Sequence, residues 1–244
     1  GKLALVRQCL RSLFASHDPA DMEVVVIEGG GTQVQDTLGK DFPAVQWFAA
    51  EDGWGFSKIN NEAVGYTSAP NILLLNNDTI LRKGFLEKML AAMQNDIGIV
   101  GAKLLHLDGT IQHIGIVFDT DGVPGHVGYG IKDDGTYNPA MRSDYYDAVT
   151  FACALIRRDV WDAVGGLDEA YHFNYEDVDF CLKAREKGYR CWVESTATIT
   201  HLENKSFDVR SNKANPLWPN LKIFRDKWLT TDRMAKITGQ WVRK

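Results

Sequence analysis

Five carboxylates fall between positions 168 and 179, in a segment that is otherwise apolar enough to be core, and a single histidine, His201, follows at the end of a strand-like run. The five are Asp168, Glu169, Glu176, Asp177 and Asp179. Neighbouring carboxylates beside buried surface repel one another and lose hydration, so a metal, a cationic substrate, helix N-terminal amides or a catalytic role must compensate them. An acidic first turn of a helix, which the helix dipole favours, explains the spacing equally well.

The helical phase of the segment that starts at Glu176 separates these carboxylates. At 100° per residue the apolar stripe of the helix consists of Val178, Cys181 and Leu182. Asp177 lies at one border of this stripe, whereas Glu176 and Asp179 point away from its centre. Partial burial would raise the pKa of Asp177 and the helix N-terminus would lower it, and both outcomes suit a proton acceptor at neutral pH. We therefore predict that Asp177 does chemistry and that Asp179 is structural.

A second polar group, Asn76-Asn77-Asp78, directly follows the apolar run Asn71–Leu75. One aspartate with amide oxygens suits a hard divalent cation that is bound mainly through the phosphates of a substrate. The same residues also form a good turn sequence. Taken alone, His201 is more often a structural residue than a ligand. Together with Asp78 it would complete a mixed oxygen and nitrogen site, which Mn²⁺ tolerates better than Mg²⁺.

Expected helices and strands alternate along the first 95 residues, and these elements must position the polar residues named above. The expected helices are Leu3–Phe14, Phe56–Tyr66 and Lys83–Met93, and the expected buried strands are Glu23–Glu28, Val45–Ala49 and Asn71–Leu75. This alternation predicts an α/β fold with a parallel sheet and crossover helices, in which ligands bind at the carboxyl ends of the strands. The glycine run 29–31 lacks the GxGxxG spacing and is a weak nucleotide fingerprint.

In the second half of the chain the order of expected helices and strands changes. Strands are expected at Ile97–Leu105, Ile111–Phe118, Ala148–Ile156 and Trp192–Thr200, with a short helix at Asp159–Val164. The region 119–144 has little periodicity and predicts a long surface loop that orders on binding. A polar and mobile segment, 204–213, then precedes an amphipathic helix that carries Leu217, Leu221, Phe224 and Trp228. We expect a main domain at 1–203 and a linker with a helical tail at 204–244.

Composition excludes several classes of protein. The 244 residues are 45% hydrophobic, enough for one substantial core, and the net charge of −5 with scattered basic residues argues against nucleic-acid binding. The apolar runs are far shorter than the roughly 18 residues that a membrane span needs. Four cysteines lie in apolar surroundings without a Cys-x-x-Cys pair, so we expect reduced, buried thiols and a cytoplasmic protein rather than a zinc site or disulfides.

Six ordered pieces between Leu3 and Trp228 together resemble glycosyltransferase family 2, the inverting enzymes with a GT-A fold that include bacterial rhamnosyl- and galactosyltransferases of surface polysaccharides. The pieces are Cys9-Leu-Arg-Ser-Leu13, Val24-Val-Val-Ile-Glu28, Gly55-Phe-x-x-x-x-Asn61, Leu75-Asn-Asn-Asp-Thr79, Gly165-Gly-Leu-Asp-Glu169, and Tyr175-Glu-Asp-Val-Asp179 through to His201. The resemblance implies a single Rossmann-like mixed sheet flanked by helices.

The resemblance also implies roles for individual residues. Asn76-Asn77-Asp78 would stand for the DXD motif of the family, with Asp78 and His201 binding a divalent cation, Mn²⁺ or Mg²⁺, that bridges the donor diphosphate. Asp177 would be the base that deprotonates the acceptor hydroxyl, with Glu176 as its acidic neighbour. Donor contacts would come from Glu28, Lys58, Asn61, Asn76 and Asn77, and acceptor contacts from Asp168 and Glu169.

The implied substrates are a nucleotide-sugar donor, a UDP- or dTDP-sugar, and a saccharide or lipid-linked saccharide acceptor that faces the loop 119–144. The implied location is the cytoplasm at the inner face of the membrane, with peripheral association through parts outside this sequence. The sequence departs from the family pattern at its start, because the usual opening strand precedes the first helix and this sequence begins at Gly1-Lys2. Without that strand a nucleotide pocket lacks one wall.

Two alternatives remain. A saccharide-binding domain of the same fold without turnover would fit Asn76 in place of an aspartate and the absence of the opening strand. A nucleotidyltransferase would share the sheet and the metal, but the basic, glycine-rich phosphate loop expected after its first strand is not visible in this sequence.

Overall fold

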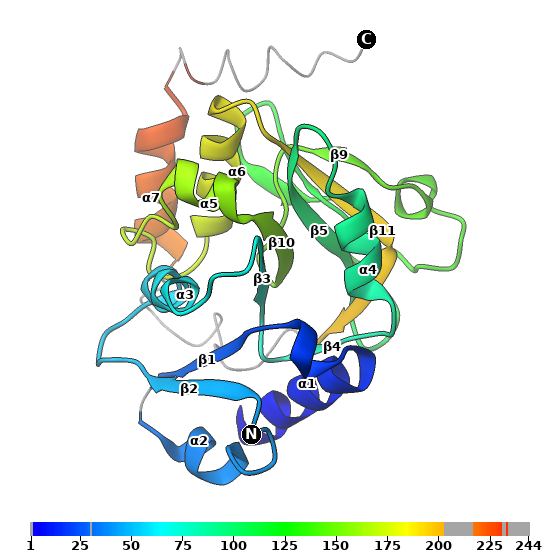
Figure 1. Ribbon diagram of the computed structural model, residues 1–244. Coiled ribbons are helices and arrows are strands. Elements are labelled where there is room, and N and C mark those ends of the chain that lie inside the picture. Colours follow the sequence, from blue (N-terminus) through cyan, green and yellow to red (C-terminus); the bar gives the residue numbers. More distant parts are fainter. Residues whose placement is uncertain (1, 30, 203–216, 231–232, 234–244) are drawn as a thin grey trace.

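The computed structural model describes residues 2–29, 31–202, 217–230 and 233. A central mixed sheet is flanked by helices on both sides, with α4 on one side and α5, α6 and α7 on the other (Figure 1). The segment 204–213, predicted to be mobile, lies outside the described residues. Within the described ranges, none of the helices has the length and apolar character that crossing a membrane requires.

The N-terminal elements follow the predicted order with additions. They are α1 (Lys2–Ser16), η1 (Pro19–Asp21), β1 (Val24–Glu28), α2 (Gln33–Leu38), β2 (Val45–Ala49), α3 (Phe56–Gly65), β3 (Asn71–Leu75), β4 (Thr79–Ile80) and α4 (Phe85–Ala92). The later elements are β5 (Ile97–Leu105), β6 (Ile111–His113), β7 (Ile116–Phe118), β8 (Pro124–His126), η2 (Asn138–Met141), β9 (Asp144–Tyr146), β10 (Cys153–Arg157), α5 (Arg158–Val164), α6 (Glu176–Glu186), β11 (Arg190–His201) and α7 (Leu217–Trp228).

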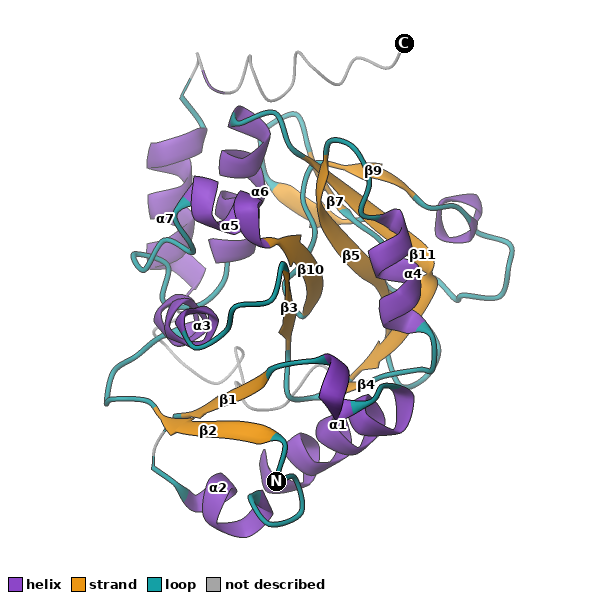
Figure 2. Cartoon of the chain, in the orientation of Figure 1, coloured by secondary structure: helices purple, strands orange, loops and turns teal. Residues whose placement is uncertain are grey.

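Among the described residues the main sheet has seven strands, in the order β3-β10-β5-β11-β4, with β6 on β5 and β9 on β11. The expectation of a parallel sheet was wrong for β3, because β10 returns antiparallel between β3 and β5. Parallel pairing occurs between β5 and β11 and between β1 and β2. The β1–β2 pair is separate from the main sheet (Figure 2). Among the described strands only β2 pairs with β1, and all five β1 residues are half-buried rather than buried as predicted.

β5 forms the centre of the core, since all nine of its residues are buried. A continuous apolar run of this kind is typical of a strand that is covered on both faces. On one face the core includes Trp161 of α5, Phe180 of α6 and Trp228 of α7. On the other face it includes Leu13 of α1 and Met89 of α4. The four cysteines are buried free thiols, as predicted.

The predicted strand Ile111–Phe118 is interrupted at Gly115, which separates β6 from β7. Gly115 has φ +126°, and a Cβ at this position would lie 2.2 Å from the ring of Tyr146. Only glycine fits this left-handed backbone and this close approach. The interruption turns β7 away from β6 so that it forms a hairpin with β8. The region 119–144 is therefore not without structure, since it contains β8 and η2.

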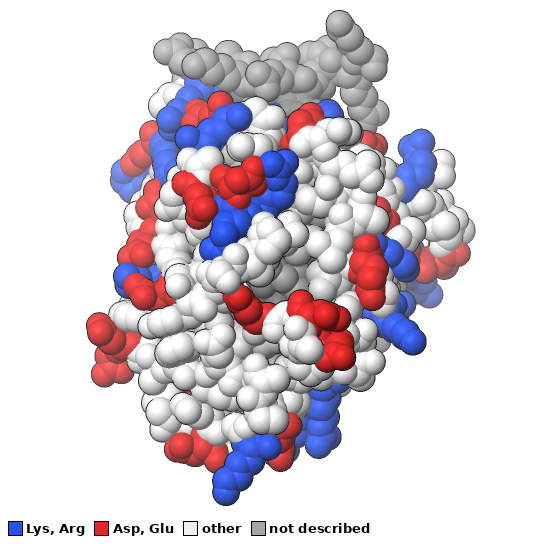
Figure 3. All heavy atoms as spheres, viewed as in Figure 1, with Lys and Arg blue, Asp and Glu red and all other residues white. Residues whose placement is uncertain are grey.

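The helix α2 was not predicted. Its backbone N–H groups at Val34 and Gln35 donate to the carboxylate of Glu28, at 2.8–2.9 Å and 3.4 Å. A carboxylate in this place satisfies amides that have no partner within the helix and complements the helix dipole. On the face drawn in Figure 3, basic and acidic side chains are interspersed.

Candidate functional site

Pairing between β4 and β11 brings Asp78 and His201 together from opposite parts of the chain. His201 lies opposite Thr79 in this antiparallel ladder, and the N–H of Leu202 donates to the carbonyl of Asp78 at 2.9 Å. The His201 Nε2 atom lies 3.0 Å from Oδ1 of Asp78, and the two side chains are only 12% and 10% exposed. The sequence indicated that Asp78 and His201 together could complete a mixed oxygen and nitrogen site, and the family resemblance implied that both bind the cation.

The imidazole of His201 is oriented by Gln112, a buried residue of β6. Oε1 of Gln112 lies 2.6 Å from Nδ1 of His201, and Nε2 of Gln112 lies 3.4 Å from Nδ1 of His106. Because an amide oxygen can only accept, Nδ1 of His201 must donate, which leaves the lone pair of a neutral ring on Nε2. This nitrogen faces Asp78, and the amide nitrogen of Asn76 is 3.4 Å away.

This arrangement fits a divalent cation. Metal-ligating histidines usually donate their second ring N–H to an oxygen, and Gln112 supplies that oxygen for His201. Within the described residues no group of three or more His, Cys, Asp or Glu side chains gathers around a common point. Two protein ligands are the number expected when water and substrate phosphates complete the coordination of a hard cation. Asn77, the middle residue of the turn, is exposed.

The acidic pair Glu176-Asp177 opens α6, directly after Asn174 and Tyr175, which both have left-handed backbone angles (φ 70° and 71°). Non-glycine residues in this region store strain that often accompanies functional sites. The Oδ1 atom of Asp177 accepts the N–H of Val178 at 2.8 Å. The turn thus fixes both carboxylates at the N-terminus of the helix.

The two carboxylates of the pair differ in the groups that surround them. Burial and the negative charge of Asp177 raise the pKa of Glu176 to about 8, and in the described residues its Oε2 atom has no hydrogen-bond partner. Burial also raises the pKa of Asp177, while the N–H of Val178, the ring of His126, the N–H of Phe151 and the hydroxyl of Thr150 oppose that increase. At pH 7 Glu176 is therefore mostly protonated, and of the two carboxylates Asp177 is the one whose neighbours favour the charged form.

Glu176 and Asp179, which the helical phase places away from the centre of the apolar stripe of α6, are nevertheless both buried. α7 covers this side of α6. Because the two helices are far apart in the sequence, a local sequence pattern could not predict their contact. Asp179 pairs with Lys183 at 2.8 Å and Lys227 at 2.6 Å, and the indole N–H of Trp228 donates to it at 2.7 Å. These contacts agree with the structural role expected of Asp179.

Asp168 belongs to the same group of charges. Its Oδ2 atom lies 2.6 Å from Nζ of Lys227 and 3.5 Å from Nζ of Lys183. Asp168 therefore contributes to holding α7 against α6. Its predicted contact with an acceptor stays a prediction.

Two predicted donor contacts and one predicted acceptor contact lie together between α3 and the segment 165–171. Both ends of the Asn61 amide bind the backbone of Leu167, at 2.8 and 2.9 Å, and its nitrogen also donates to Glu169 at 3.0 Å. Lys58 pairs with Glu62 at 2.7 Å and lies 3.7 Å from Glu169. Asn61 thus ties the 165–169 turn to α3. The donor and acceptor roles of Lys58, Asn61 and Glu169 stay predictions, as does that of Glu28, whose carboxylate caps α2.

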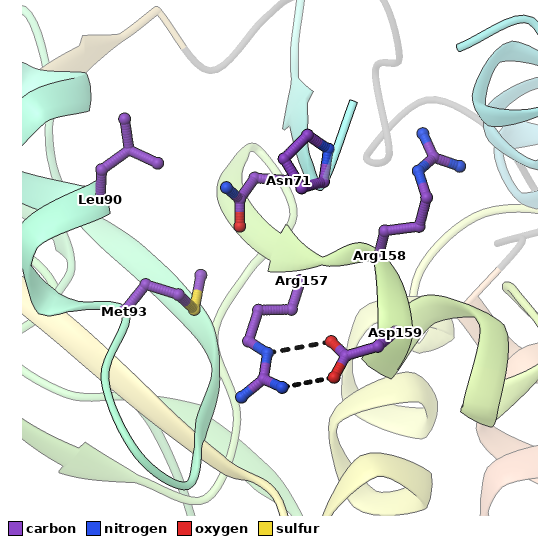
Figure 4. A pocket seen from close by; sticks show the side chains of 7 residues that line it. Asn71, Leu90, Met93, Arg157, Arg158 and Asp159 are labelled. Carbon is purple, nitrogen blue, oxygen red and sulfur yellow. Dashed lines mark hydrogen bonds and ion pairs between the residues drawn. The ribbon is translucent and has the colours of Figure 1, made fainter. Parts of the chain in front are cut away.

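A surface hollow of about 460 Å³ lies at the other end of β3 from the Asn76–Asp78 turn. It is lined by Pro70, Asn71, Leu90, Met93, Arg157, Arg158 and Asp159, and Arg157 and Asp159 form an ion pair across part of it (Figure 4). Asn71 comes five positions before Asn76 along an extended strand, which corresponds to a distance of roughly 15 Å. The hollow is therefore separate from the candidate site.

Comparison with known proteins identifies the family. A family model described as glycosyltransferase-like family 2 matches residues 1–215. The chain belongs to glycosyltransferase family 2. The chain is 32% identical, over 84% of its length, to protein y4gI of Sinorhizobium fredii, and 25% identical, over 92% of its length, to the O-antigen biosynthesis protein RfbC of Myxococcus xanthus. It spans 24% and 18% of the length of these two relatives.

Solved structures confirm the GT-A fold of this chain. GalNAc-T7, solved with UDP, GalNAc and Mn²⁺, aligns with a TM-score of 0.68 at 9% identity, over 90% of this chain and 45% of that one. The mannosyltransferase PcManGT of Pyrobaculum calidifontis, solved with GDP-Man and Mn²⁺, aligns with a TM-score of 0.61 at 14% identity, over 83% of this chain and 54% of that one. The predicted fold class is confirmed.

One residue beside the Asp78–His201 pair, Gln112, escaped the sequence reasoning. The signal was present, because two adjacent polar residues interrupt an apolar strand pattern, and polar groups buried in a core need partners.

Proposed function

We propose that this glycosyltransferase moves a sugar, with inversion, from a nucleoside-diphosphate sugar to a hydroxyl group of a saccharide or lipid-linked saccharide. The observation that carries the proposal is the buried Asp78–His201 pair, with Nδ1 of the imidazole committed to Gln112 and Nε2 facing the carboxylate. The UDP and GDP-Man ligands and the Mn²⁺ ions of the two similar structures support the same chemistry.

In this proposal Asp78 and His201 hold the divalent cation, Mn²⁺ or Mg²⁺, and Asn76 and Asn77 lie beside it. When bound, the cation would neutralise charge on the diphosphate leaving group as a Lewis acid. Glu28, Lys58 and Asn61 are proposed as donor contacts, and Asp168 and Glu169 as acceptor contacts. The residues of this set that bind other parts of the protein would act by positioning the loops that line the donor.

Asp177 is the proposed base. The acceptor oxygen attacks the anomeric carbon from the face opposite the leaving group, and Asp177 takes the proton of that hydroxyl. Several neighbours of Asp177 favour its ionised form, and the pKa of about 8 lets the buried neighbour Glu176 retain its own proton at pH 7. Glu176 thereby acts as a neutral partner that leaves the charge of the pair at one position.

The proposed pathway is the synthesis of a bacterial surface polysaccharide, which the similarity to the O-antigen protein RfbC supports. The proposed location is the cytoplasm, at the inner face of the membrane, with attachment through other parts of the protein.

A thermal-shift screen of UDP-, dTDP- and GDP-sugars with Mn²⁺ tests donor binding. A donor at 100 times its dissociation constant stabilises the folded protein by about 2.7 kcal/mol. Release of the nucleoside diphosphate, measured with a panel of p-nitrophenyl hexosides as acceptors, then distinguishes an enzyme from a saccharide-binding domain without turnover. Binding without release would favour the binding domain, and a panel without any thermal shift would contradict the proposal.

A further inference from the structure

A buried amide from α7 holds the turn that precedes the acidic pair. The side-chain nitrogen of Asn220 donates to the carbonyl of Phe173 and, at 3.1 Å, to the carbonyl of Asn174. Carbonyl oxygens can only accept, so the amide must direct its nitrogen towards them, and two acceptors match the two N–H donors of an amide. Asn220 is only 4% exposed. A side chain that comes 46 positions after Asn174 thus binds the backbone just before Glu176.

The backbone of this turn is strained. Asn174 and Tyr175 have consecutive left-handed φ angles of 70° and 71°, which are uncommon for asparagine and rarer still for a bulky residue such as tyrosine. Such a conformation persists only where surrounding contacts impose it. The carbonyl of Tyr175 accepts the N–H of Asp179 at 2.9 Å, so the same residue starts the hydrogen bonding of α6. The backbone angles of the turn therefore set the direction in which the acidic pair leaves it.

One face of α7 contacts the chain both before and after the proposed base. The buried ring of Phe224 packs against Tyr175, with the two centroids 5.2 Å apart. One helical turn later, Lys227 and Trp228 bind the carboxylate of Asp179. Positions i, i+4, i+7 and i+8 lie on the same side of a helix, and counted from the amide that binds the turn, these residues occupy those positions. α7 therefore holds the first turn of α6 at two places.

We propose that Asn220 is a positioning residue for the transfer reaction. By binding the two carbonyls of the turn, it keeps the carboxylate of Asp177 in the orientation that takes the proton of the acceptor hydroxyl. The inference rests on the proposed function. Since Asn220 acts through the backbone of the turn, its loss should lower turnover and leave the affinity for the donor unchanged.

The rate of nucleotide release tests this role, with Mn²⁺, the donor found in the thermal-shift screen and a p-nitrophenyl hexoside as the acceptor. Asn220→Leu has a similar size and no N–H donor. It should lower kcat by about 10–100-fold, since a misplacement of about 1 Å can cost about 100-fold in rate. Its dissociation constant for the donor should stay within about twofold of the wild type.

Trp228→Phe is the matched control, because it removes a hydrogen bond between α7 and Asp179 and leaves the contacts of the turn in place. Its kcat should stay within about threefold of the wild type at a temperature where all variants are folded. A loss of kcat in Asn220→Leu no larger than in this control, or an equal weakening of donor binding, would overturn the inference.

A double-mutant cycle tests whether the effect passes through Asp177. In the Asp177→Asn background, which lacks the base, Asn220→Leu should lower the residual rate by less than about twofold, because residues that act as a unit are not additive. A purely structural role would lower the rate by the same factor in both backgrounds, and that result would refute the positioning role.

Crystal structures of the wild type and of Asn220→Leu test the turn without any substrate. We expect positive φ angles at Asn174 and Tyr175 in the wild type and the loss of at least one of them in the variant. A turn that stays left-handed at both residues in the variant would contradict the inference. If Asn220→Leu does not fold, Asn220→Ser replaces it with the same expectations, since one short hydroxyl cannot bind both carbonyls.

Failure of the proposed function looks different, because the wild type would then release no nucleotide from any donor. In that case the positioning role falls with it, while the crystal structures still decide whether Asn220 holds the turn.

Discussion

Replacement of Glu176 by glutamine is predicted to stabilise the protein, and to do so more strongly as the pH rises. The side chain is only 6% exposed, and its Oε2 atom lacks a hydrogen-bond partner among the described residues. Burial and the charge of Asp177 raise its pKa from 4.5 to about 8. A carboxyl group whose pKa is raised by folding favours the folded state fully below its unfolded pKa, and that contribution is lost as the pH rises through the folded pKa.

The size of the effect follows from the difference between the two pKa values. Each unit between the unfolded pKa and the working pH costs about 1.4 kcal/mol, so an ionisable Glu176 destabilises the fold by on the order of 3 kcal/mol at pH 7 and 5 kcal/mol above pH 8, relative to pH 4. Glutamine has nearly the same shape and stays neutral. The stability difference between Glu176→Gln and the wild type should therefore grow from pH 5 to pH 8 and then level off.

Urea unfolding at pH 5, 6, 7 and 8, without metal, measures this difference. The other titrating groups are common to both proteins and cancel to first order in the comparison. Glu186→Gln, at the opposite and more exposed end of α6, is the matched control. If the difference between Glu176→Gln and the wild type is the same at pH 5 and pH 8, the assignment of a buried, protonated Glu176 is wrong.

Three further predictions concern the metal and the hairpin. Chelation with EDTA should abolish nucleotide release and Mn²⁺ should restore it, because the cation neutralises the leaving group; activity indifferent to EDTA would rule out the metal role. Gln112→Leu should weaken Mn²⁺ activation about 10–100-fold in a titration of activity, since Nδ1 of His201 loses its oriented acceptor, and an unchanged titration would show that Gln112 does not tune the ligand. Gly115→Ala should lower the free energy of unfolding by roughly 2–5 kcal/mol, because alanine is strained at φ +126° and its Cβ clashes with Tyr146. The control Gly109→Ala, at φ +82° in open space, should lower it by only about 1–2 kcal/mol. Equal losses in the two variants would disprove the clash.

The sequence was informative wherever a local pattern decides the structure. β3 and β5 appear at the predicted residues because continuous apolar runs of strand length have few alternatives. The turn after β3 and the histidine at the end of β11 could be paired because strand ends gather at one edge of a sheet. The family resemblance then supplied the roles of Asp78, Asp177 and His201, which spacing alone left open.

What the sequence could not predict depends on contacts between distant residues. α2 forms because a carboxylate from the preceding strand, Glu28, caps it. Asn61 resembled a ligand residue, yet both ends of its amide bind Leu167. The burial of Asp179 depends on Lys227 and Trp228, which come about fifty residues later. A helix with one apolar stripe is a reasonable local prediction, but a second helix can cover its other side.

The most direct test of glycosyl transfer with Asp177 as the base is the rate of nucleotide release by Asp177→Asn, measured with the donor found in the thermal-shift screen, Mn²⁺ and a hexoside acceptor. General-base catalysis contributes about 10²–10⁴ in rate, so the variant should lose at least 99% of turnover while its dissociation constant for the donor stays within about twofold. A variant that keeps more than a tenth of the wild-type rate would show that Asp177 is not the base.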